Sequence, residues 1–140
     1  MPDPVSTDAT RRDAVLQDYY RAFAEHDAAA RRTLLERCMT EDAEIWGPQR
    51  VFRGYDGIGE KIEGFHQSRP GQRLVLASGM HEFLDTVRLR GALVDAAGQT
   101  VALGEALFEF AADGRIARVF PMWESLPPEA PAHWPRELVC

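Results

Sequence analysis

The feature that most constrains the fold is a short turn, Asp113-Gly114, between two runs of alternating apolar and polar residues. One run extends over residues 101–110 and the other over residues 116–123. Alternation with a period of two is typical of strands that bury one face, and Asp-Gly accommodates the positive φ of a tight hairpin. The sequence therefore predicts an antiparallel hairpin, and with it a sheet that has one buried face.

The first half of the chain has helical periodicity instead. One apolar stripe, in which Tyr19 takes part, follows candidate caps at residues 6–8 and predicts a first helix. Asp27 can cap a second helix, and a third is expected over Tyr55–His66 despite its three glycines. Three helices in the first half, with most of the strands after them, predict an α+β domain whose helices cover one face of a sheet.

Shorter apolar segments complete this sheet. We expect strands at residues 43–46, 74–77 and 86–94 in addition to the terminal hairpin. Residues 1–126 are predicted to form a single domain. Four prolines between residues 127 and 140 are incompatible with regular helix or central strand, so this tail is expected to wrap the surface.

Composition excludes several classes of function. The formal net charge is −6, whereas nucleic-acid binding needs clustered positive charge, so no nucleic-acid partner is expected. Cys38 and Cys140 imply no disulfide framework, and four scattered histidines imply no metal site. No segment is long and apolar enough to span a membrane, and no signal peptide is evident, so we expect a cytoplasmic protein that needs no cofactor and contacts no membrane.

Four segments, taken in order, carry a resemblance to a known family. They are an apolar helix with an acidic stop at residues 18–27, an acidic pair and strand ending at Pro at residues 39–48, a glycine-led helix at residues 52–62, and the terminal hairpin. In this order the chain resembles the nuclear transport factor 2-like superfamily, which includes ketosteroid isomerases and SnoaL-like polyketide cyclases. The resemblance implies a cone-like, curved antiparallel or mixed sheet that, with three helices, encloses a cavity.

The resemblance also argues against one reaction. The tyrosine of ketosteroid isomerase falls on Tyr19, but its general-base aspartate falls on Gly47 and its protonated aspartic acid on Ala106. Steroid isomerisation needs a base to move a proton and a neutral acid to stabilise the enolate. Glycine and alanine supply neither group, so ketosteroid isomerase chemistry is not expected.

Strand alternation, together with the resemblance, assigns the cavity wall. The residues expected to bind a ligand are Trp46, Gly47, Leu89, Gly91, Gly104, Ala106, Phe108, Phe110 and Trp123. Tyr19 and His66 are the catalytic candidates, the first as a hydrogen-bond donor and the second as a general base at the cavity mouth. The plainer alternatives are a packing role for Tyr19 and a capping or surface role for His66.

The opposite sheet face would expose an apolar group between charged residues: Leu103, Leu107, Phe120 and Met122. Such a patch predicts a homodimer through this face, although the proline-rich tail is an alternative cover.

Three hypotheses for function follow. The first is a SnoaL-like protein that binds a small apolar ring-containing molecule. If this protein is an enzyme, the expected class is a cofactor-free isomerase, cyclase, hydratase or dehydratase. The second is a non-catalytic binding or interaction module. The third is an engineered variant of this scaffold with an opened pocket.

Overall fold

The computed structural model describes residues 5–77 and 79–123, so the predicted tail at residues 127–140 lies outside the described chain. Three helices are present: α1 (Val5–Ala24), α2 (Ala28–Cys38) and α3 (Gly54–Ser68). The seven strands are β1 (Met39–Trp46), β2 (Val51–Arg53), β3 (Arg73–Leu76), β4 (His81–Phe83), β5 (Thr86–Val94), β6 (Thr100–Phe110) and β7 (Ile116–Trp123). None of the three described helices is both long enough and apolar enough to cross a membrane.

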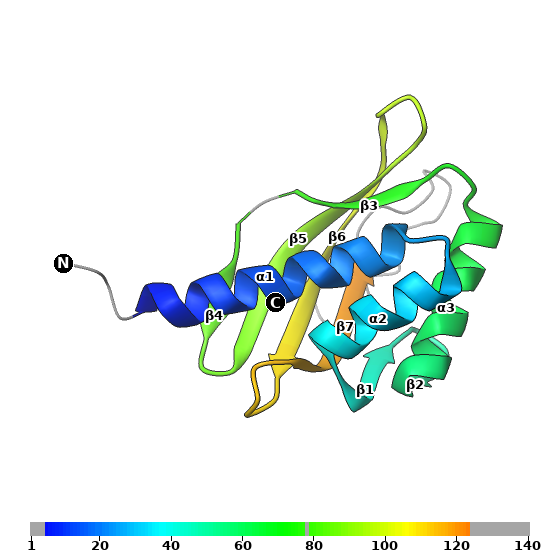
Figure 1. Cartoon of the computed structure of the whole chain (residues 1–140). Helices are drawn as coiled ribbons and strands as arrows, with labels where there is room; N and C mark the ends of the chain where they lie inside the picture. Colours follow the sequence, from blue (N-terminus) through cyan, green and yellow to red (C-terminus); the bar gives the residue numbers. More distant parts are fainter. Residues whose placement is uncertain (1–4, 78, 124–140) are drawn as a thin grey trace, which may run out of the picture.

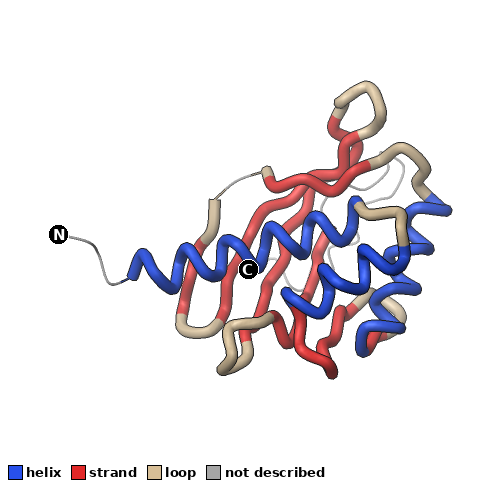
Figure 2. Tube along the Cα trace, in the orientation of Figure 1, coloured by secondary structure: helices blue, strands red, loops and turns tan. Residues whose placement is uncertain are grey.

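All seven strands belong to one mixed sheet. Its order is β2-β1-β7-β6-β5-β3, and β4 pairs with the first residues of β5 on the same edge as β3. The contact between β1 and β7 is parallel, and the other pairings are antiparallel. The helices lie together on one face of this curved sheet, with α1 crossing it and α2 and α3 beside β1 (Figures 1 and 2). The predicted α+β architecture is confirmed.

Local signals in the sequence account for most element boundaries. The Asp27 carboxylate accepts a hydrogen bond from the Ala30 amide at 2.8 Å, as expected of a helix cap. Gly114 has φ 89°, and the Ala111 amide donates to the Arg115 carbonyl at 2.7 Å, which closes the predicted β6–β7 hairpin. Two expectations are corrected: α1 begins at Val5, before its predicted caps, and β2 extends the sheet beyond the strand predicted at residues 43–46.

The core lies between the helices and the inner face of the sheet. Alternation along β6 is as predicted, because Gly104, Phe108 and Phe110 are buried. Facing residues on neighbouring strands share this inner face, since Phe108 pairs with Val87 and with Val119, and all three are fully buried. The same face therefore supplies both the core and the wall of the cavity described next.

Candidate functional site

A cavity of about 750 Å³ opens between α1, α3, β2 and the inner face of β5, β6 and β7. Its lining is Tyr19, Phe23, Arg50, Phe52, Glu60, Lys61, Gly64, Phe65, Ser68, Arg69, Leu74, Leu93, Ala102, Pro121 and Trp123. Aromatic and aliphatic side chains predominate, and a few polar groups interrupt them. This is the usual construction of a site for a small organic molecule.

Small residues on β6 make room for this cavity. Ala102 lines it, and Gly104 pairs with Trp123 on β7. A Cβ atom at position 104 would lie 2.6 Å from the Trp123 ring and 2.5 Å from the Met122 carbonyl oxygen. Glycine is therefore required at this position, because only a residue without a side chain lets the indole lie against the strand and form part of the wall.

Tyr19 contributes a phenol to the cavity from α1. The side chain is 4% exposed, and its ring lies 4.9 Å from that of Phe23 and 5.0 Å from that of Phe108. Burial raises the pKa of Tyr19 well above its ordinary value, so the phenol keeps its proton at neutral pH. No residue in the described part of the chain hydrogen-bonds with its hydroxyl, which leaves a donor for a ligand.

Charged groups also line the cavity, which the sequence pattern did not predict. They are Arg50, Glu60, Lys61 and Arg69, three cations and one anion in a chain whose net charge is −6. The Arg50 guanidinium lies 4.3 Å from the centre of the Phe52 ring, and Lys61 Nζ lies 4.8 Å from it. Burial lowers the pKa of Lys61 below its ordinary value. The cavity is thus apolar in its walls and positive at its polar groups.

Lys61 could have been recognised from the helical spacing. The buried face of α3 carries Ile58, Ile62 and Phe65. Lys61 lies three residues after Ile58 and four before Phe65, so it shares their side of the helix.

Trp46 is the first expected wall residue that the structure places elsewhere. Its neighbour Ile45 is fully buried, so alternation turns Trp46 to the outer face, where it is 44% exposed. The indole packs against Phe120 at 5.7 Å and donates a hydrogen bond to the Glu44 carboxylate at 3.0 Å. The expectation that Trp46 lines the cavity is therefore wrong.

His66 is also outside the cavity lining. Its Nε2 donates to the Phe23 carbonyl oxygen at 2.6 Å, and its ring stacks on His26 at 4.0 Å. The preceding residue, Phe65, faces the cavity instead. His66 thus joins α3 to the end of α1, as the capping alternative predicted, and the expected position of a general base at the cavity mouth is corrected.

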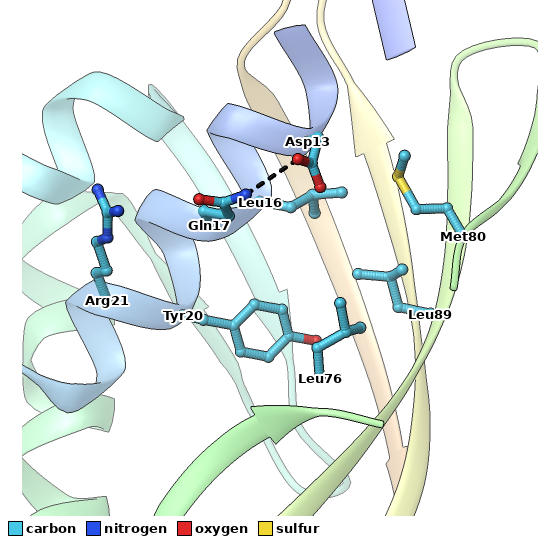
Figure 3. Close-up of a pocket in the computed structure, with 8 residues that line it drawn as sticks. All are labelled: Asp13, Leu16, Gln17, Tyr20, Arg21, Leu76, Met80 and Leu89. Carbon is cyan, nitrogen blue, oxygen red and sulfur yellow. Dashed lines mark hydrogen bonds between the residues drawn. The ribbon is translucent and has the colours of Figure 1, made fainter. Parts of the chain in front are cut away.

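Leu89 lines a second, smaller pocket instead of the large cavity, and Gly91 lies beside Tyr20, which lines that smaller pocket too. This groove of about 230 Å³ lies between α1 and the strands near β3, and it is lined by Asp13, Leu16, Gln17, Tyr20, Arg21, Leu76, Met80 and Leu89 (Figure 3). A Cβ atom at Gly91 would lie 3.8 Å from the Tyr20 hydroxyl oxygen, and burial raises the pKa of that phenol to about 12. Tyr20 extends from α1 toward Leu76 in this groove.

The remaining expected residues lie around the cavity rather than in its lining. The Gly47 amide donates to the Arg50 carbonyl at 2.9 Å in the β1–β2 turn. Ala106 pairs with Leu89 and Pro121 on the inner face and is partly buried. Phe108 and Phe110 fill the core beyond the cavity. Of the predicted wall and catalytic residues, the cavity itself brings together Tyr19 and Trp123.

Comparisons with known proteins agree with this architecture. A proposed isomerase of the SnoaL-like family from Agrobacterium tumefaciens is 28% identical, with a TM-score of 0.76 over 83% of this chain and 99% of that one. A proposed SnoaL-like polyketide cyclase from Jannaschia is 16% identical, with a TM-score of 0.66 over 82% and 86% of the two chains. An NTF2-like protein of unknown function from Exiguobacterium is 18% identical, with a TM-score of 0.64 over 80% and 99%. No match is found among curated proteins.

The family model for the SnoaL-like domain matches residues 16–119. This range includes most of α1 and continues into β7, so it covers the elements that form the cavity. The fold is the NTF2-like and cystatin-like fold of the solved structures, and the chain belongs to the SnoaL-like domain family.

Proposed function

We propose that this protein binds a small, ring-containing organic molecule in the cavity between α1, α3 and the sheet. The observation that carries the proposal is a cavity of about 750 Å³ whose walls include Tyr19, Phe52, Phe65 and Trp123. Aromatic walls favour a ring, and the buried phenol of Tyr19 can donate a hydrogen bond to its oxygen substituent.

The class of chemistry that suits this site is cofactor-independent isomerisation, cyclisation, hydration or dehydration. The printed names of two structural relatives, a proposed isomerase and a proposed polyketide cyclase, support this class. A neutral phenol can stabilise a developing oxyanion during proton transfer α to a carbonyl. Tyr19 would take this role, and the base would come from a residue other than the carboxylates that ketosteroid isomerases use.

A non-catalytic binding role is the second candidate, because of two specific positions. Gly47 and Ala106 stand where ketosteroid isomerase has its base and its neutral acid, and neither can move a proton. Turnover separates the two candidates. Ketones, epoxides and polyketide-like compounds would be screened against the unaltered chain and against Tyr19→Phe and His66→Ala, and unchanged turnover in a variant would clear that residue of a catalytic role.

Binding itself is tested with acetophenone, a ring-containing ketone. We expect it to quench Trp123 fluorescence and to stabilise the fold by about 2.7 kcal/mol at a hundredfold excess over Kd. Trp123→Phe should remove the quench, and Tyr19→Phe should weaken binding. If acetophenone neither quenches nor stabilises, while the folded chain is intact by circular dichroism, the binding proposal fails for this class of ligand.

We also propose that the outer sheet face forms a homodimer contact. Leu103 is 39% exposed and Met122 46% exposed there, beside Trp46. Ion pairs flank this face, Arg88 with Glu105 at 2.9 Å and Arg118 with Glu109 at 2.9 Å. Apolar surface with a charged border is typical of an interface. Leu103→Arg should convert dimers to monomers by light scattering, and an unaltered chain that is monomeric at micromolar concentration would contradict the proposal.

A further inference from the structure

The chain contains a single lysine, Lys61, although it has 16 basic residues in all. Its side chain comes from α3 and lines the large cavity. Every other basic residue is an arginine, whose guanidinium stays protonated and is a poor nucleophile at neutral pH. The one side-chain amine of the protein is therefore located in the cavity proposed for the ligand.

Lys61 has no acidic partner in the described chain. The neighbouring Glu60 carboxylate lies 3.9 Å from Arg50, and the Arg69 guanidinium donates to the Gln72 side chain at 3.4 Å. The contact of the Lys61 amine is instead the Phe52 ring at 4.8 Å. An ammonium group without a carboxylate, partly buried against an aromatic ring, loses hydration that no ion pair replaces.

A second cation, Arg50, also lies against the Phe52 ring. Arg50 lies 4.3 Å from the centre of the Phe52 ring, and a guanidinium keeps its charge at all relevant pH values. Burial disfavours the protonation of an amine, because the charged form loses its hydration. Burial indeed lowers the pKa of Lys61. Amines in such surroundings are the ones that act as nucleophiles toward carbonyl groups.

We propose that Lys61 is an amine nucleophile that forms an imine with the carbonyl carbon of an aldehyde or ketone held in the cavity. This inference rests on the proposed binding of a ring-containing ligand there. The amine lone pair forms a C–N bond while the carbonyl π bond breaks, and one nitrogen proton is transferred to the oxygen to give a carbinolamine. The hydroxyl takes a second proton from solvent or from Glu60, which lines the same cavity, and leaves as water while the nitrogen lone pair forms the C=N bond. The last nitrogen proton then returns to solvent or to Glu60.

The single lysine makes the proposal directly testable. The folded chain is incubated with benzaldehyde and sodium cyanoborohydride, which reduces an imine to a stable secondary amine, and the modified residue is located by peptide mass spectrometry. The amino-terminal amine of the same chain is an internal standard, because its ordinary pKa makes it the more reactive amine at neutral pH. We expect Lys61 to be labelled at least about tenfold faster than a lysine of ordinary pKa, and to match or exceed the terminal amine.

Two controls define the outcome. In denaturing urea the preference should reverse in favour of the terminal amine, and Lys61→Arg should remove the internal adduct while the fold is retained. Slow labelling of Lys61 in the folded chain, at the rate measured in urea, would overturn the proposal.

A second measurement separates this proposal from the binding proposal. Benzyl alcohol has the same ring but no carbonyl group, so it reports binding alone through thermal stability. Stabilisation by benzyl alcohol without rapid Lys61 labelling would leave the binding proposal standing and reject the amine nucleophile. A different outcome would reject the binding proposal. In that outcome Lys61 is labelled rapidly, the labelling rate does not saturate as the benzaldehyde concentration rises, and benzyl alcohol does not stabilise the fold.

Discussion

The two ends of β6 differ in the size of the side chains on their shared inner face. Toward its end, Phe108 is fully buried and Phe110 nearly so, and both fill the space beneath α1. Toward its beginning, Ala102 and Gly104 leave that space open, and the cavity lies there. The strand and its alternation are continuous between the two ends, so the size of each inward side chain decides where the core stops and the cavity begins.

The neighbouring strand β7 shows the same difference between its two ends. Val119 is fully buried opposite Phe108, whereas Trp123 is 42% exposed opposite Gly104 and lines the cavity. The end with Phe108 and Val119 is therefore stabilised by close packing, whereas the end with Gly104 and Trp123 presents aromatic surface to a ligand. Substitutions at the two ends should accordingly differ in what they damage.

The largest effect is expected at the filled end. Phe108→Ala removes a fully buried ring that contacts Tyr19 at 5.0 Å, and it should lower the free energy of unfolding by about 3–5 kcal/mol. Chemical denaturation measures this loss. The matched control is Phe120→Ala, on the outer face, where the ring is only partly buried and the loss should be clearly smaller. Equal losses would show that the two faces do not differ in packing.

Position 104 should respond by a different mechanism. Gly104→Ala places a Cβ atom 2.5 Å from the Met122 carbonyl oxygen, so β7 and Trp123 must shift, at a cost of about 1–3 kcal/mol. Acetophenone binding should weaken as well, because Trp123 forms the wall. In contrast, Gly59→Ala meets no atom within 4 Å and lies in α3, where it should stabilise by about 0.5–1 kcal/mol. A neutral Gly104→Ala would contradict the role assigned to this glycine.

A larger side chain at the open end should affect ligand more than fold. Ala102→Leu adds methylene groups to the cavity lining, so the empty protein should stay as stable as before while acetophenone binds about tenfold more weakly, or about 1.4 kcal/mol. Titration by tryptophan fluorescence measures the affinity. Ala112→Leu, at an exposed position in the β6–β7 turn, should leave affinity unchanged. Unfolding by Ala102→Leu would mean that the residue belongs to packed core.

Much of this contrast could be read from the sequence, because alternation along β6 is regular and its turn is closed by Gly114 with φ 89°. The failures have physical reasons. The pairing of β6 and β7 shifts between Glu109 and Phe110, so the fully buried residues of β7, Ile116 and Val119, are three apart and do not follow a period of two. Alternation places Trp46 on the outer face, because its neighbour Ile45 is fully buried. The sequence pattern predicted no charged residue in the cavity, although Lys61 has the helical spacing of the buried residues Ile58 and Phe65.

The smallest expected effect concerns Lys61 and the stability of the open end. Its pKa is lowered in the folded state by burial, so the folded chain binds fewer protons than the unfolded chain between that lowered pKa and the ordinary lysine value. The stability penalty is therefore complete below the lowered pKa, and it diminishes as the pH rises through this window.

Lys61→Met removes the penalty and should make the fold slightly more stable at neutral pH. The gain should stay below about 1 kcal/mol, because the contact with Phe52 is lost too. It should shrink toward alkaline pH, whereas Lys61→Arg, which keeps its charge, should become less stable relative to the unaltered chain over the same range. Urea denaturation at a series of pH values checks both trends, and comparison with the unaltered chain cancels the titration of the buried tyrosines. A Met variant that is less stable at neutral pH would show that Lys61 stabilises the cavity, and the open end would then be maintained by packing as the filled end is.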